Sequence, residues 1–168
     1  SPIGPLKVPL GCFYQVNLPV ADELVRQVRE WYAQAAAESN TRQVLDLYCG
    51  VGVLALACAA DGATPVHGIE SVRSAVAAAR RNSKELNLPA TFKCARVEEA
   101  ARNGFDELDL SRRIVVADPP RKGLEPNVTE TLANGRVPHI IYVACDPATL
   151  ARDIRRFGSF GYRLRGAR

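Results

Sequence analysis

The sequence lacks methionine altogether, has only two histidines and one tryptophan, and begins with serine. We therefore expect it to be an excised part of a longer translation product. It lacks any run near the roughly 18 consecutive apolar residues that a membrane-spanning helix needs, and no secretory leader opens it. By elimination, the expected location is the cytoplasm. His67 and His139 fall within predicted strands, so we expect structural roles for both and predict no metal site.

Cysteine is present, but in no paired pattern. The five cysteines stand at positions 12, 49, 58, 94 and 145. An odd number without a CxxC pair encodes neither a disulfide framework nor a zinc site. Free cysteines usually behave as small hydrophobic residues, so a reactive one needs an independent argument.

The net charge is only +4, but it is unevenly distributed. Against the single acid Asp153, the last part of the chain carries Arg152, Arg155, Arg156, Arg163, Arg165 and Arg168. Such a basic edge suits the phosphates of a nucleic acid, but a solvated arginine face explains it equally well. With 168 residues, 47% of them hydrophobic, the chain is long enough for one domain with a substantial core.

From Gln43 onward, short apolar runs alternate with helical stretches, which is typical of an α/β fold with a doubly wound, mostly parallel sheet. The predicted strands are 44–48, 65–70, 91–95, 114–118 and 139–144. The predicted helices are 53–61, 71–87 with Ser71 as N-cap, 97–103, 126–133 and 147–157. The terminal FGYRLR begins another strand, so we expect the C-terminal strands of the sheet to be truncated.

Ahead of the sheet, an amphipathic helix is predicted over residues 19–37, and its packed face contains Val20, Leu24, Val28 and Trp31. Residues 1–18 are predicted to form an extended lead-in. Residues 19–168 are then the ligand-binding domain.

A glycine-containing loop, Asp46-Leu47-Tyr48-Cys49-Gly50-Val51-Gly52, follows the first predicted strand. Open parallel sheets bind ligands at this position, and Gly50 and Gly52 allow the backbone to approach closely. The third glycine of a dinucleotide fingerprint is missing, and Asp46 suits an amino or hydroxyl group better than a pyrophosphate. Glu70 closes the second strand, where a carboxylate can accept hydrogen bonds from both hydroxyls of an adenosine ribose. Together these features favour S-adenosylmethionine over a nicotinamide cofactor.

Asp118-Pro119-Pro120-Arg121 follows the fourth predicted strand at the same edge of the sheet. The two prolines stiffen the turn and hold the aspartate beside the expected methyl group; alternatively, Asp118 only caps a rigid loop. Many methyltransferases that modify exocyclic amines carry an aromatic residue after the prolines. Arg121 stands there instead, and its cation suits a phosphate or a carbonyl oxygen.

Cys145 comes directly after the fifth predicted strand, so we expect it at the same edge as Asp46, Glu70 and Asp118. Carbon 5 of uracil is too weak a nucleophile to take a methyl group unaided. A thiolate that adds to carbon 6 creates an enolate, which accepts the methyl group at carbon 5 before a base removes the proton there. Cys145 is the candidate for that thiolate.

These residues resemble the RNA uracil-5-methyltransferases, which modify transfer or ribosomal RNA. The resemblance starts at Gly11-Cys12-Phe13-Tyr14-Gln15-Val16-Asn17, which is similar to the family's F-x-Q-x-N segment. It continues through DLYCGVG, GIE at 68–70, Asn82, DPPRKG and Cys145-Asp146-Pro147. The resemblance implies a Rossmann-like methyltransferase fold, S-adenosylmethionine as cofactor and RNA as partner. It further implies that Gln15, Tyr48, Glu70 and Asp118 contact the cofactor and that Cys145 forms a covalent adduct with the uracil.

Three features depart from the family's pattern. Ala144 and Asp146 replace the usual serine and asparagine beside the nucleophile, and a negative charge there disfavours a thiolate. Val53 stands where some members have asparagine. The family's proton-abstracting glutamate is expected beyond Arg168, and a small barrel-like RNA-binding domain is expected before this core. Without them we expect cofactor binding but poor turnover.

Two alternatives stay open. An RNA cytosine-5-methyltransferase uses the same covalent chemistry but carries a cysteine in the motif after the fourth strand, where this chain has Arg121. A catalytically silent module that binds S-adenosylmethionine or RNA is consistent with Ala144, with Asp146 and with the missing base.

Overall fold

A computed structural model describes residues 3–9 and 17–168 of the chain. Five parallel strands form one sheet in the order β3-β2-β1-β4-β5. The strands are β1 (Gln43–Leu47), β2 (Val66–Glu70), β3 (Ala90–Cys94), β4 (Arg113–Ala117) and β5 (His139–Tyr142). The predicted parallel α/β sheet is confirmed, with strand limits that differ from the prediction by one or two residues.

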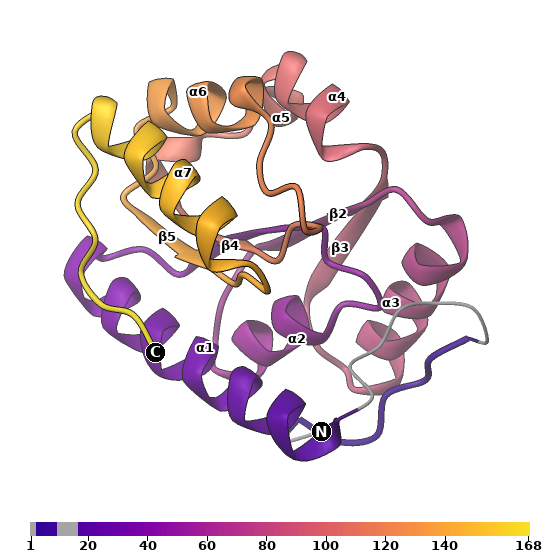
Figure 1. The fold of residues 1–168 in the computed structure, drawn as a ribbon. Helices are drawn as coiled ribbons and strands as arrows, with labels where there is room; N and C mark the ends of the chain where they lie inside the picture. Colours follow the sequence, from indigo (N-terminus) through magenta and orange to yellow (C-terminus); the bar gives the residue numbers. More distant parts are fainter. Residues whose placement is uncertain (1–2, 10–16) are drawn as a thin grey trace.

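Helices cover both faces of the sheet (Figure 1). One face carries α1 (Leu18–Ser39), α2 (Val53–Ala60) and α3 (Arg73–Glu85). The other carries α4 (Val97–Arg102), the short α5 (Gly104–Glu107), α6 (Pro126–Asn134) and α7 (Pro147–Ser159). A 3-10 helix, Leu110–Arg112, precedes β4. None of the helices in the described part of the chain is long and apolar enough to cross a membrane.

The central strand β1 is apolar on both faces because helices cover both faces. Val44 belongs to the core on the α1, α2 and α3 side, whereas Leu45 and Leu47 belong to the core on the other side. All three side chains are fully buried. Asp46 is the polar exception among the buried residues of this strand.

The predicted packed face of α1 is largely confirmed. Val28 is buried, and Leu24 and Trp31 are partly buried against the same core, whereas Val20 is 53% exposed. Val25 and Tyr32, which the prediction did not include, are buried beside them. The hydroxyl of Tyr32 donates a hydrogen bond to the carbonyl oxygen of Arg42 (3.5 Å), just before β1.

The prediction that FGYRLR begins a strand is wrong, because residues 160–168 form none. After α7 the chain turns back and runs beside α1 (Figure 1). Arg165 pairs there with Glu38 (3.2 Å) and Arg168 with Glu30 (3.7 Å). The two ion pairs connect this C-terminal segment to α1.

Gly68 in β2 provides a test of the packing. A Cβ atom at this position would lie 2.5 Å from Phe92 Cδ1 and 2.8 Å from Cys49 Sγ. We expect Gly68→Ala to lower the free energy of unfolding by about 1–3 kcal/mol through overpacking, as measured by urea denaturation. Gly158→Ala in α7 is the control, because its Cβ would meet nothing within 4 Å. Equal unfolding midpoints for the two variants would contradict the packing described here.

Candidate active site

The carboxyl ends of the strands bring most of the predicted site residues to one edge of the sheet. Asp46 is the second-last residue of β1, Glu70 ends β2, and Asp118 comes directly after β4. Cys145 follows β5 after two intervening residues rather than directly, since β5 ends at Tyr142. The predicted cofactor contact Gln15 lies outside the described residues.

Asp46 is 1% exposed and closes the loop between β1 and α2. Its Oδ2 accepts a hydrogen bond from the backbone N–H of Ala55 (2.9 Å) in the first turn of α2. Its Oδ1 is buried without a partner among the residues that the structure describes. Burial raises the pKa of this carboxyl, and the charges of Asp118 and Glu70 raise it further. The unpaired oxygen is an acceptor that a bound ligand could satisfy.

The glycines of this loop allow it to turn tightly over the sheet. Gly50 and Gly52 have φ values of 54° and 87°, in the left-handed region that favours glycine. A Cβ at Gly52 would also lie 3.0 Å from Phe92. The loop backbone therefore lies close to the sheet and leaves its outer side open to a ligand.

Glu70 fastens the same loop to the start of α3. Its Oε2 accepts a hydrogen bond from Gly50 N (3.1 Å), and its Oε1 accepts from Val72 N (2.8 Å) and the Ser71 hydroxyl (3.1 Å). The predicted N-cap role of Ser71 is wrong, because α3 begins at Arg73 with Val72 as its capping residue. The hydroxyl that would have capped the helix is engaged by Glu70.

Tyr48 lies one residue after β1, and its ring packs against the α4–α7 side of the core. Its hydroxyl donates a hydrogen bond to Glu98 Oε1 (3.1 Å) in α4. Burial and the nearby Glu98 carboxylate raise the pKa of Tyr48. Since the hydroxyl is engaged by α4, the ring is the part of Tyr48 that remains for a ligand.

Asn82 in α3 has a role that the sequence did not reveal. It is 1% exposed, and its Oδ1 accepts a hydrogen bond from Lys7 N (2.9 Å). Its Nδ2 donates to Lys7 O (3.2 Å) and to Val51 O (3.1 Å). One amide thus joins the lead-in to the loop after β1. The signal in the sequence was its spacing from Ala78 and Ala79, which places a polar group on the buried face of the helix.

Asp118 begins the turn after β4. Its backbone N–H donates a hydrogen bond to Leu47 O (3.3 Å), so the turn starts in register with β1. Its side chain keeps an exposed surface, but the surrounding groups displace much of its water, and this desolvation raises its pKa to about 6. At neutral pH the carboxyl is therefore ionised but close to its titration range.

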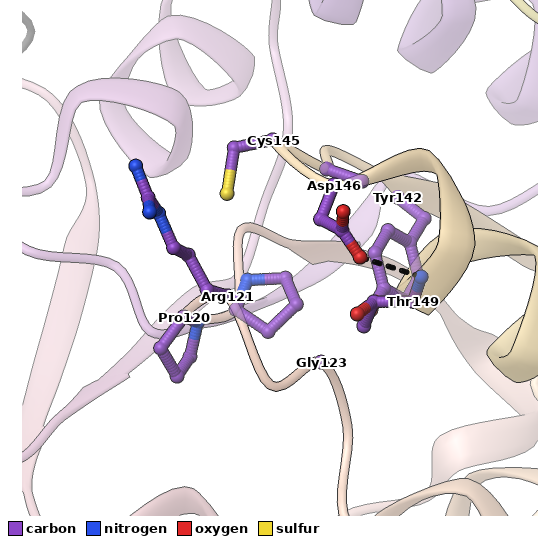
Figure 2. Close-up of a pocket in the computed structure, with 9 residues that line it drawn as sticks. Pro120, Arg121, Gly123, Tyr142, Cys145, Asp146 and Thr149 are labelled. Atoms are coloured by element: carbon purple, nitrogen blue, oxygen red, sulfur yellow. Dashed lines mark hydrogen bonds between the residues drawn. The ribbon is translucent and has the colours of Figure 1, made fainter.

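Cys145 is exposed and lines a small pocket that is open to solvent. The other lining residues are Pro119, Pro120, Arg121, Gly123, Tyr142, Ala144, Asp146 and Thr149. Figure 2 shows the sulfur of Cys145 pointing toward the Pro120–Arg121 turn. The structure thus brings together the two motifs that the sequence places after β4 and after β5.

Asp146, the residue after Cys145, is the N-cap of α7. Its Oδ2 accepts a hydrogen bond from Thr149 N (2.8 Å). Hydrogen bonds from Thr149 lower the pKa of Asp146, and the cations Arg121 and Arg152 lower it further. Aspartate and asparagine are comparable N-cap residues, so the departure from asparagine preserves the start of this helix.

The other cysteines in the part of the chain that the structure describes fall into two groups, buried and exposed. Cys49 and Cys58 are buried, and burial raises the pKa of both thiols. Cys94 is exposed and is the last residue of β3. Because β3 and β5 are the two outer strands of the sheet, Cys94 and Cys145 lie at opposite ends of the same edge.

Four of the six arginines in the C-terminal part of the chain form ion pairs. Arg152 and Arg156 share the buried Asp153. Arg165 and Arg168 pair with Glu38 and Glu30 of α1. Three acids face these four arginines, so this end of the chain keeps an excess of positive charge.

Comparison with known proteins shows which family the chain matches. Residues 6–160 match the family described as tRNA (Uracil-5-)-methyltransferase. An RNA methyltransferase of Enterococcus faecalis is 40% identical over 151 residues, which are 89% of this chain and 32% of that protein. A second RNA methyltransferase, from Streptomyces coelicolor, is 39% identical over 96% of this chain and 34% of its own length. The chain thus spans about a third of the length of these relatives.

Solved structures of methyltransferases also resemble this chain. The tRNA (uracil-54, C5)-methyltransferase of Pyrococcus abyssi, in complex with S-adenosyl-L-homocysteine, is 34% identical, with a TM-score of 0.71 over 87% of this chain and 33% of that chain. The magnesium protoporphyrin IX methyltransferase of Synechocystis, with bound SAM, has a TM-score of 0.57 at 18% identity, over 87% of this chain and 75% of that chain. The second likeness concerns the fold alone. The fold is the Rossmann-like methyltransferase fold that the sequence predicted.

The raised pKa of Asp118 predicts a pH-dependent stability. The folded state holds this proton more tightly than the unfolded state, so the ionised carboxyl destabilises the fold increasingly as the pH rises from about 4 to about 6. Asp118→Asn removes the charge and should gain stability relative to the wild type across this range. Urea denaturation at about pH 4.5 and about pH 7.5 measures the difference. A stability difference that is the same at both pH values would contradict the prediction.

Proposed function

The chain belongs to the tRNA (uracil-5-)-methyltransferase family, and from this premise we propose that it transfers a methyl group from S-adenosylmethionine to carbon 5 of a uridine in RNA. The observation that carries the proposal is the exposed Cys145, whose sulfur points toward the Pro120–Arg121 turn (Figure 2). We take transfer RNA as the first candidate substrate, ribosomal RNA as the second, and the cytoplasm as the place of action.

The loop after β1 and the residues around it fit S-adenosylmethionine. Among the residues that the structure describes, none donates a hydrogen bond to the buried Oδ1 of Asp46. This acceptor suits the amino group of the cofactor. The loop backbone at Gly50 and Gly52 leaves room for close approach. Glu70 would accept hydrogen bonds from the ribose hydroxyls. When bound, the cofactor supplies an electrophilic methyl group on a sulfonium ion.

Further contacts would come from both sides of this loop. We propose that the Tyr48 ring and Asp118 border the cofactor, and that Gln15 reaches it from the lead-in of residues 1–18, outside the domain of residues 19–168. Asn82 supports this arrangement because its amide holds Lys7 of the lead-in to Val51 of the loop.

Cys145 would act as the nucleophile. Its sulfur adds to carbon 6 of the uracil, and the new C–S bond leaves an enolate whose carbon 5 accepts the methyl group. A base then removes the proton from carbon 5, and the C–S bond breaks to release the thiolate. The uridine has to leave its stack first, since carbon 6 is shielded in a helix. Arg121 lines the same pocket and would bind a carbonyl or phosphate oxygen of this nucleotide.

Cofactor binding can be tested without RNA. Glu70→Gln keeps the shape of the side chain but removes its charge, and hydrogen bonds to charged groups contribute about 1.5–3 kcal/mol. We therefore expect the Kd for S-adenosylmethionine, measured by isothermal titration calorimetry, to rise by about tenfold or more. Glu99→Gln, at an exposed position on α4, is the control and should leave the Kd unchanged. An unchanged Kd in Glu70→Gln would remove Glu70 from the proposed cofactor site.

The nucleophile can be tested by trapping its adduct. The full-length protein is incubated with S-adenosylmethionine and RNA that contains 5-fluorouridine, and the products are separated on a denaturing gel. Fluorine cannot leave as a proton does, so the covalent complex should persist. Cys145→Ser should abolish it, whereas Cys94→Ser, which alters the other exposed thiol at this edge, should retain it.

The alternatives give different results in this experiment. A catalytically silent module would give no complex with any variant. Trapping that survives in Cys145→Ser would show that another residue is the nucleophile. Transfer RNA and ribosomal RNA fragments tested side by side decide between the two substrates.

A further inference from the structure

Asp153 in α7 is fully buried, and it lies behind the pocket that contains Cys145. Its Oδ2 accepts hydrogen bonds from Leu124 N (2.9 Å) and from the Tyr142 hydroxyl (2.7 Å). Its Oδ1 accepts from the guanidinium groups of Arg152 (2.8 Å) and Arg156 (3.4 Å). Every partner donates a hydrogen bond, and an ionised carboxylate can accept hydrogen bonds on both of its oxygens.

The partners of Asp153 come from the two segments that form the pocket. Leu124 lies in the segment 118–125 between β4 and α6, and Tyr142 is the last residue of β5, three positions before Cys145. The two arginines that bond to Asp153 also donate hydrogen bonds to the first of these segments. Arg152 also donates to Lys122 O (2.7 Å), and Arg156 to Leu124 O (2.9 Å).

Gly123 shows how closely the first segment lies against α7. Its φ is +73°, and a Cβ there would collide with the Asp153 carboxylate, the Thr149 methyl group and the Arg152 guanidinium. No side chain fits between the loop and the helix at this point. The buried carboxylate therefore contacts the loop backbone directly, and the position of the loop follows that of α7.

We propose that Asp153 is a positioning residue, which sets the distance between the Asp118–Arg121 turn and the sulfur of Cys145. This inference rests on the proposed function, in which the nucleotide binds between these two groups. Asp153 is too deeply buried to touch the nucleotide and acts through Leu124 and Tyr142. Displacing reacting groups by about 1 Å can cost a hundredfold in rate, so a buried anchor shared by both walls of the pocket would affect the rate of adduct formation.

Two variants of the full-length protein test the proposal. Tyr142→Phe removes one hydrogen bond to Asp153. Asp153→Asn replaces one carboxylate oxygen by an NH₂ group, which then faces the N–H or O–H donors that surround this side chain. Tyr32→Phe is the control, because it removes the hydroxyl of a buried tyrosine on the opposite face of the sheet, where that hydroxyl donates to the carbonyl oxygen of Arg42. Should Asp153→Asn fail to fold, Tyr142→Phe alone decides the question.

Three quantities are measured for each variant: the rate of adduct formation with 5-fluorouridine RNA, the Kd for S-adenosylmethionine, and hydrogen exchange of the peptide spanning residues 118–125. In Tyr142→Phe and Asp153→Asn we expect the adduct rate to fall by about tenfold or more. We also expect exchange of the 118–125 peptide to become faster, with the Kd changed by less than about twofold. Tyr32→Phe should lower the thermal midpoint without changing any of the three quantities.

The possible failures are distinguishable. Absence of an adduct with the wild-type protein would overturn the proposed function and this inference with it. A wild-type adduct that Tyr142→Phe and Asp153→Asn form at the same rate would overturn the inference alone. A rate that falls equally in Tyr32→Phe would also overturn it, because the effect would then follow general stability.

Discussion

The site depends on one constraint, the common direction of all five strands. Because the strands are parallel, their carboxyl ends meet at one edge, and the loops that follow β1, β2, β4 and β5 are brought together there. Asp46, Glu70, Asp118 and Cys145 come from four separate parts of the chain, and no local structure could bring them together. The site therefore depends on the apolar runs that allow the central strands to be buried on both faces.

Polar side chains hold this edge in shape, and Glu70 is the one among them that is only partly buried. Asp46 bonds to the first turn of α2, Glu70 joins the loop after β1 to the start of α3, and Asp153 joins the loop after β4 to α7. Asn82 performs the same task for the lead-in. A buried polar group is costly unless it is hydrogen-bonded. Each of these side chains therefore favours one geometry of its loop over the alternatives, and the unpaired Oδ1 of Asp46 is the exception that points to a ligand.

The cysteines show how position and environment act together. Cys49 and Cys58 are ordinary core residues whose thiols are kept protonated by burial. Cys94 and Cys145 are both exposed at the carboxyl edge, so exposure by itself does not identify a nucleophile. What distinguishes Cys145 is the pocket that it shares with the Pro119–Arg121 turn and its place immediately before the N-cap of α7.

The sequence by itself determined the parallel α/β sheet, the glycine loop and the order of the motifs, because strand and helix periodicity and turn chemistry are local properties. It did not determine that Val20 is exposed while Tyr32 completes the buried face of α1, that the C-terminal segment pairs with α1 instead of forming a strand, or that Glu70 rather than α3 engages Ser71. Nor did it reveal the roles of Asn82 and Asp153, whose partners lie 75 and 29 positions away in the chain. Only the tertiary structure decided these points, since a buried polar group is satisfied by whichever distant donors or acceptors the fold brings within hydrogen-bonding distance.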